Sequence, residues 1–265
     1  MSTETWAVAA PQTIEVEGVT GVDVRLQGGR AEVVADAAAT VTRIDVLEVS
    51  DKPLQVVRDG DRLRVGYESS WFDSVVARVK SPRRSERAVV RLVVPPDAAV
   101  DVGTVDADVE VSGGRKVAVR TVTGTIRTAG TTGPMSVRTV SGEVAVTDHT
   151  GDASASVVSG RLALDGALGR VSLTSVSGAA TVAPTTSPMI TAKTVSGALD
   201  LRLLPGTPVN VKVRGASGQV VLDGSVLPSS GATLVVDHAE QPAEGRSAAY
   251  LSATVTSAHV TVDRR

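Results

Sequence analysis

A five-residue motif that recurs about every eighteen residues is the strongest constraint on the fold. It reads Arg-Thr-Val-Thr-Gly at 120–124 and Arg-Thr-Val-Ser-Gly at 138–142, and it continues in looser form as far as 214–218. The closing glycines are separated by 18, 18, 18, 19 and 21 residues, at Gly124, Gly142, Gly160, Gly178, Gly197 and Gly218. A short period repeated this often predicts units that stack on one another rather than one folded core.

Aliphatic residues form columns when the repeats are aligned on that glycine. Positions seven and five before it, and two and four after it, are aliphatic in nearly every repeat, as are Val171, Leu173, Ala180 and Val182 around Gly178. Spacings of two place side chains on one face of a strand. Another column stands two positions before the glycine, and it consists of Val122, Val140, Val158, Val176, Val195 and Ala216. We expect it to point inward as well, because a bend or bulge near the Ser-Gly pair can reset the alternation. The residues just before it are then expected to face solvent: Thr121, Thr139, Ser175 and Thr194.

The fold class that follows is all-β, with the repeats forming a parallel β-solenoid (β-helix-like) of ~18-residue coils. Each coil would contain a strand, a corner at the Ser-Gly pair, a second strand and a connector rich in turn residues. Coils are expected to stack ~4.8 Å apart and to be right-handed, because parallel crossovers favour that sense. Only 2% of residues are aromatic while 42% are apolar, so Val, Ala, Leu and Ile must fill the core.

The sequence divides into four expected segments. Residues 1–11 are expected to be disordered, and 12–96 read as non-repeating strands that form an irregular N-terminal β cap or wider coils. The repeats occupy 97–223, and 224–265 is expected to supply C-terminal coils and a cap, with a loop at 237–249. Caps are expected because exposed edge strands recruit other chains.

Composition excludes several classes of function. The chain has no cysteine, so disulfides and thiolate chemistry are excluded, and a net charge of −2 with both signs mixed gives no basis for nucleic-acid binding. No run of about eighteen apolar residues predicts a membrane-spanning helix, and Met1–Gly18 lacks the pattern of a signal peptide. We therefore expect a cytoplasmic chain, with no cofactor and no evident small-molecule substrate.

The tandem Thr-Val-Ser-Gly units, each followed by alternating apolar residues, resemble a bacterial family of β-strand-repeat domains of unknown function that is labelled "putative adhesin". The resemblance covers nearly the whole chain: the strand 62–67, the aromatic pair Trp71-Phe72 and the strand ending at Val93-Val94-Pro95 precede the repeats in the same order. It implies the repeat architecture and brings no catalytic residues. The adhesin label implies display at a cell surface, and related members are associated with the envelope stress response.

Polar residues give no sign of catalysis or metal binding. A nucleophile needs a base and an acid within reach, so the serines before the glycines are interpreted as a structural ladder. The acidic residues of the first coil are expected on a solvated strand face rather than at an ion site: Asp101, Asp106 and Asp108. Isolated histidines are expected at the surface: His149, His238 and His259.

A basic and aromatic segment is the one candidate binding site. Aromatic and arginine side chains are frequent interface anchors, and the candidates are Trp71, Phe72, Arg83, Arg84 and Arg87. The simpler interpretation is a hairpin that covers the end of the solenoid and whose charges protect its edge. Recognition of a protein partner is the alternative, and a membrane or nucleic-acid contact is a third reading.

The function expected from the sequence is non-catalytic: an adhesin-like structural or interaction protein that presents a rigid surface to a protein partner or to itself. One alternative is an envelope-stress or membrane-associated sensor, which rests on the family resemblance. Another is an enzyme acting on polysaccharide, but residues 100–222 contain no aromatic residue that could hold a sugar.

Overall fold

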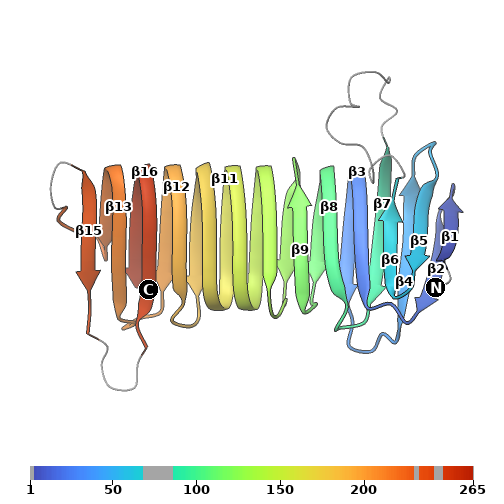
Figure 1. Cartoon of the computed structure of the whole chain (residues 1–265), viewed down its shortest axis with the longest axis horizontal. Coiled ribbons are helices and arrows are strands. Elements are labelled where there is room, and N and C mark those ends of the chain that lie inside the picture. Colours follow the sequence, from blue (N-terminus) through green and yellow to red (C-terminus); the bar gives the residue numbers. More distant parts are fainter. Residues whose placement is uncertain (1–2, 68–85, 230–232, 242–246, 265) are drawn as a thin grey trace. The chain divides into compact units, whose positions relative to one another are not determined.

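The computed structural model describes residues 3–67, 86–229, 233–241 and 247–264, and every regular element in these ranges is a β-strand (Figure 1). The strands pair in both parallel and antiparallel fashion. They form two compact units, Met1–Thr131 and Thr132–Arg265. The chain is therefore all-β, as predicted.

Within the residues that the structure describes, the first unit contains ten strands. They are β1 (Thr3–Val8), β2 (Gln12–Glu17), β3 (Gly21–Ala35), β4 (Val41–Val49), β5 (Leu54–Asp59), β6 (Arg62–Gly66), β7 (Arg87–Val94), β8 (Ala99–Ser112), β9 (Lys116–Thr121) and β10 (Thr125–Ala129). Strand β3 is parallel to β8 on one side and to β6 and β7 on the other. Beyond β6 and β7 the pairing is antiparallel, through β5 and β1 and through β4 and β2. Residues expected to be disordered thus include the outer strand β1.

The second unit contains β11 (Met135–Pro184), β12 (Met189–Leu203), β13 (Val209–Leu222), β14 (Ser225–Val226), β15 (Leu234–Ala239) and β16 (Ala249–Arg264). The repeats pair in parallel and in register, so that Gly178 lies opposite Gly197. Strand β16 is parallel to both β12 and β13 and lies between them, and Ala258 takes the place of the motif glycine opposite Gly197 and Gly218 (Figure 1). The spatial order of the repeats therefore differs from their order in the sequence, because β12 and β13 are consecutive repeats but are not neighbours in the sheet. Strands β14 and β15 run antiparallel to β13.

The columns seven and five before the glycine, and two and four after it, form the core as predicted. Val171, Leu173, Ala180 and Val182 are all buried, and the corresponding residues of the other repeats are buried with them. Strand β16 follows the same pattern, since its four aliphatic residues at these positions are buried: Leu251, Ala253, Val260 and Val262.

The prediction for the two columns before the glycine was wrong. The valines two positions before it are 40–48% exposed: Val122, Val140, Val158, Val176 and Val195. In contrast, Thr121 and Thr139 are buried, and Ser175 and Thr194 are partly buried. The side chains at the seventh, fifth and third positions before the glycine thus all face the core, as in a regular strand. The alternation of inward and outward side chains is interrupted after the valine rather than before it.

The glycine itself resets the alternation. At Gly142, Gly160, Gly197 and Gly218 the φ angle lies between 133° and 146°, a region that disfavours every residue with a Cβ. A Cβ on Gly160 would also come within 2.0 Å of the carbonyl oxygen of Gly142 in the neighbouring repeat. Glycine is therefore required at these four positions, whereas Gly178 and Ala258 in the same column do not have positive φ.

The serine ladder has the structural role expected of it. The hydroxyls of Ser159, Ser177 and Ser196 donate to the valine carbonyls of the preceding repeat, at 3.3, 3.4 and 3.2 Å. Val140, Val158 and Val176 are thus each joined through the main-chain carbonyl to the next repeat.

Replacing Gly160 with alanine is expected to lower the free energy of unfolding by at least about 3 kcal/mol, through backbone strain and the clash with the Gly142 carbonyl. Gly224→Ala is the matched control, because Gly224 also has positive φ (77°) but no atom lies within 4 Å of its added Cβ. The control should cost only about 1–2 kcal/mol. Urea denaturation measures both, and equal losses would contradict the close approach.

The exchange Thr139→Val is expected to raise the free energy of unfolding by about 1 kcal/mol, because the Thr139 hydroxyl is buried with no hydrogen-bond partner. The adjacent exchange Val140→Thr should be nearly neutral, since that side chain is exposed. Thermal unfolding of the two variants decides which residue faces the core. A stabilising Val140→Thr with a destabilising Thr139→Val would contradict this orientation.

Candidate functional site

The predicted basic and aromatic site falls mostly outside the described residues. This applies to Trp71, Phe72, Arg83 and Arg84. Arg87 begins β7 with an exposed side chain, and its carbonyl accepts a 2.8 Å hydrogen bond from the Tyr67 hydroxyl. Partner binding by this segment stays a prediction.

The acidic residues of the first repeat join strands to one another. Asp101 accepts hydrogen bonds from Arg25 and Arg120 at 3.0 and 3.3 Å. Asp106 accepts from the Thr123 hydroxyl at 3.1 Å, and Asp108 accepts from a main-chain N–H at 2.8 Å. In the described part of the chain, no three His, Asp or Glu side chains cluster in a way that could hold a metal ion.

The three histidines have different surroundings. His259 is exposed as expected, but the prediction for His149 was wrong, because its side chain is fully buried and its Nε2 lies 3.4 Å from the carbonyl oxygen of Asp152. His238 is partly exposed and belongs to the site described next.

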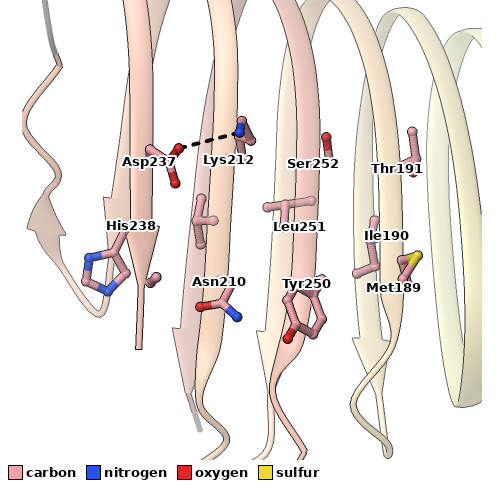
Figure 2. A pocket seen from close by; sticks show the side chains of 12 residues that line it. Met189, Ile190, Thr191, Asn210, Lys212, Asp237, His238, Tyr250, Leu251 and Ser252 are labelled. Atoms are coloured by element: carbon pink, nitrogen blue, oxygen red, sulfur yellow. Dashed lines mark ion pairs between the residues drawn. The ribbon is translucent and has the colours of Figure 1, made fainter. Parts of the chain in front are cut away.

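A surface depression of about 430 Å³ lies across β12, β16, β13 and β15 in the second unit (Figure 2). Strand register sets its residues in rows: Met189 lies opposite Tyr250, Tyr250 opposite Asn210, and Asn210 opposite Ala239. The depression therefore combines four strands, and it exists because β16 is inserted between β12 and β13.

An exposed apolar pair occupies one side of the depression. Met189 is 57% exposed and Tyr250 is 50% exposed, although both are large. In the preceding repeats the same position, eight before the glycine, holds Lys116, Pro134, Asp152 and Arg170. Exposed apolar residues that are clustered are more informative than isolated ones, so this local pair marks a candidate contact surface.

Glu240 contacts polar residues of the depression through both its carboxylate and its main chain. Glu240 accepts the main-chain N–H of Val209 at 3.0 Å and a guanidinium N–H of Arg264 at 2.8 Å. Its other oxygen lies 3.5 Å from Nε2 of His238, and its own N–H donates to Oδ1 of Asn210 at 3.1 Å. Glu240 thus contacts Asn210, which lies beside Tyr250 in Figure 2, and His238, which lies farther away on β15.

Charge around Glu240 is balanced by Arg264. Burial alone would raise the pKa of Glu240, but the Val209 N–H and the Arg264 guanidinium outweigh it and hold that pKa below its usual value. Hydrogen bonds from Arg264 chiefly lower the pKa of Asp223, and the same carboxylate, with Glu240, raises the pKa of Arg264. On the rim, Lys212 pairs with Asp237 at 3.5 Å. The depression is thus apolar and hydrogen-bonding, and the charges that line it are paired.

Sequence reasoning missed this site. Residues 237–249 were interpreted as a loop, and the aliphatic pattern of 251–262 was recognised only as one last coil. That pattern matched the repeat columns, but nothing in it indicated which repeats would be its neighbours.

Glu240→Gln is expected to lower the melting temperature at pH 7, because it removes the charge that Arg264 pairs with. A carboxylate with a depressed folded-state pKa contributes its stabilisation fully above the unfolded value, here 4.5, and loses it as the pH falls through the folded value. The difference in melting temperature between wild type and Glu240→Gln should therefore shrink progressively below about pH 4.5. Melting curves from pH 7 to pH 3 measure it, with the exposed Glu143→Gln as control. A difference in melting temperature that is unchanged at pH 3 would show that the negative charge of Glu240 does not stabilise the folded chain.

Among known proteins, the chain is similar only to solved structures. No family model matches the sequence, and no curated protein matches it. A putative adhesin from Bacteroides fragilis is 11% identical with a TM-score of 0.47, and the match covers 99% of this chain and 97% of that one. A putative lipid binding protein from Parabacteroides distasonis is 9% identical with a TM-score of 0.48 and 98% coverage of both chains. A putative cell adhesion protein from Clostridium sporogenes is 8% identical with a TM-score of 0.32, covering 97% of this chain and all of that one.

The resemblance to an adhesin-labelled family therefore has counterparts among solved bacterial structures that carry such labels. No helix in the described ranges is long and apolar enough to cross a membrane.

Proposed function

We propose that this chain is a non-catalytic, adhesin-like binding protein: a β-solenoid whose stacked repeats hold a contact surface, the depression around Tyr250, in a fixed shape. The observation that carries the proposal is the exposed pair Met189 and Tyr250 beside Asn210, whose Oδ1 already accepts the Glu240 N–H at 3.1 Å. Groups fixed before the partner arrives lose little conformational entropy on binding.

Parallel, in-register pairing of the repeats supports the solenoid. In the second unit, the end of β11, β12, β16 and β13 all pair in parallel with the motif positions aligned. Their aliphatic columns enclose one core, which is the stacking expected of quasi-linear repeats.

The chemistry of the depression supports binding rather than turnover. Four residues lining it could transfer a proton: His238 lies 3.5 Å from Glu240, Asp237 and Lys212 pair with each other at 3.5 Å, and Tyr250 is the fourth. Nucleophilic catalysis needs a hydroxyl within hydrogen-bond reach of a base that is itself oriented. Ser252 and Thr191 lie on other strands of the depression, and no hydrogen bond joins either hydroxyl to His238 in the described structure.

The double variant Met189→Ser/Tyr250→Ser tests the contact surface. The immobilised chain is incubated with detergent-solubilised cell-surface material, and retained material is quantified. Loss of two anchors worth about 1 kcal/mol each should reduce retention by tenfold or more. A matched control, Val158→Ser/Val176→Ser, removes two exposed apolar residues elsewhere in the same unit and should retain as much as wild type.

Two outcomes would contradict the proposal. Equal retention by the double variant and wild type would show that the depression is not the contact surface. If wild type releases the bound partner in a cleaved or modified form, and the double variant does not change the partner, the chain is an enzyme.

A further inference from the structure

We propose that the depression binds a neutral pyranose ring of a glycan, stacked on the side chain of Tyr250. The inference rests on the proposed binding function and names the class of ligand. It also identifies an aromatic residue that can serve the repeats although they contain none. Residues 100–222 contain no aromatic side chain, but the insertion of β16 brings Tyr250 from outside that range onto the stack of repeats.

The platform comes from Tyr250 and its neighbour. An aromatic ring has a negative face, and the C–H bonds on one face of a pyranose are weakly positive, so the two surfaces stack. The Tyr250 ring is half exposed and lies between the side chains of Met189 and Asn210 (Figure 2). The thioether of Met189, on the adjacent strand, extends the apolar surface about one strand spacing, ~4.8 Å, beyond the ring.

Hydrogen bonding to sugar hydroxyls would come first from Asn210, which lies opposite Tyr250 on the adjacent strand. Oδ1 of Asn210 accepts the N–H of Glu240 at 3.1 Å, which orients the amide and leaves its Nδ2 group to donate. Ser252 and Thr191 add hydroxyls one row away on β16 and β12. An aromatic surface bordered by fixed polar groups suits a ligand with an apolar face and polar edges.

Charge pairing favours a neutral sugar over an acidic one. Lys212 is the cationic side chain among the residues that line the depression, and it is paired with Asp237 at 3.5 Å. The guanidinium of Arg264 is committed to Asp223 and Glu240. The carboxylate of an acidic sugar would have to displace one of these partners, whereas a neutral ring leaves them intact.

The shape of the depression argues against a fatty acyl chain. Sites for apolar small molecules enclose most of the ligand surface, but this depression is open to solvent, with Met189 and Tyr250 half exposed along it. A glycan that continues into solvent at both ends fits an open surface, and copies of the chain displayed together would bind it with added avidity.

Binding of fluorescently labelled chain to a printed array of defined oligosaccharides tests the proposal, with saturation-transfer NMR on the best neutral oligosaccharide. Tyr250→Phe keeps the ring and should bind within about threefold of wild type, whereas Tyr250→Leu should lose about tenfold or more. Asn210→Asp keeps the acceptor for the Glu240 N–H but removes the donor, and should also lose about tenfold. Val158→Ser/Val176→Ser is the control, and melting curves verify that each variant is folded.

The results separate this inference from the proposed function. Retention of cell-surface material that depends on Met189 and Tyr250, but survives periodate oxidation of its glycans, would overturn the glycan while leaving the binding function intact. Array binding to acidic sugars alone would overturn the neutral class. Binding of neutral sugars that is the same in Tyr250→Leu as in wild type would overturn the site.

Discussion

The close passage of one main chain over another at the repeat corner is the constraint on which the rest of the structure depends. At Gly160 the space that a Cβ would fill is already occupied by the carbonyl of Gly142. The same contact aligns the repeats: once the glycines lie over one another, the buried columns before and after them coincide, and the serine hydroxyls reach the carbonyls of the previous repeat. The alignment of the repeats therefore follows from a main-chain contact rather than from interlocking aromatic side chains, which make up only 2% of this sequence.

Within each unit, strand pairing changes from parallel to antiparallel at one edge of the sheet. In the first unit β5 and β4 return antiparallel to β6 and β7, and in the second β15 returns antiparallel to β13. An antiparallel strand breaks the periodic match that would let a further parallel repeat continue the stack, which is one way in which proteins manage sheet edges. At β15 this return strand also forms one wall of the depression, so the ending of the stack and the candidate site use the same element.

Much of the architecture could be predicted from the sequence, and the failures have specific causes. The period of eighteen and four apolar columns identified the buried residues correctly, since burial is the reason that such columns exist. The valine column was placed on the wrong face because threonine and valine have nearly the same shape and both suit strands. Thr139 is buried without a hydrogen-bond partner and Val140 is exposed, which is the reverse of what polarity indicates. His149 was misplaced for the same reason, because polarity alone was used to assign it to the surface. The candidate site could not be predicted at all: it depends on which strands lie beside β16, and all the repeats offer similar edges.

The insertion of β16 has a consequence for how the protein is made. Strands β12 and β13 emerge from the ribosome well before residues 249–264, which pair with both of them. Until residues 249–264 are synthesised, each strand has an uncovered edge of hydrogen-bonding groups, and such edges invite wrong partners during folding. The sixteen residues of β16 therefore complete the pairing of two strands that precede them in the sequence, so a nascent chain that stalls before them leaves an unfilled position between β12 and β13.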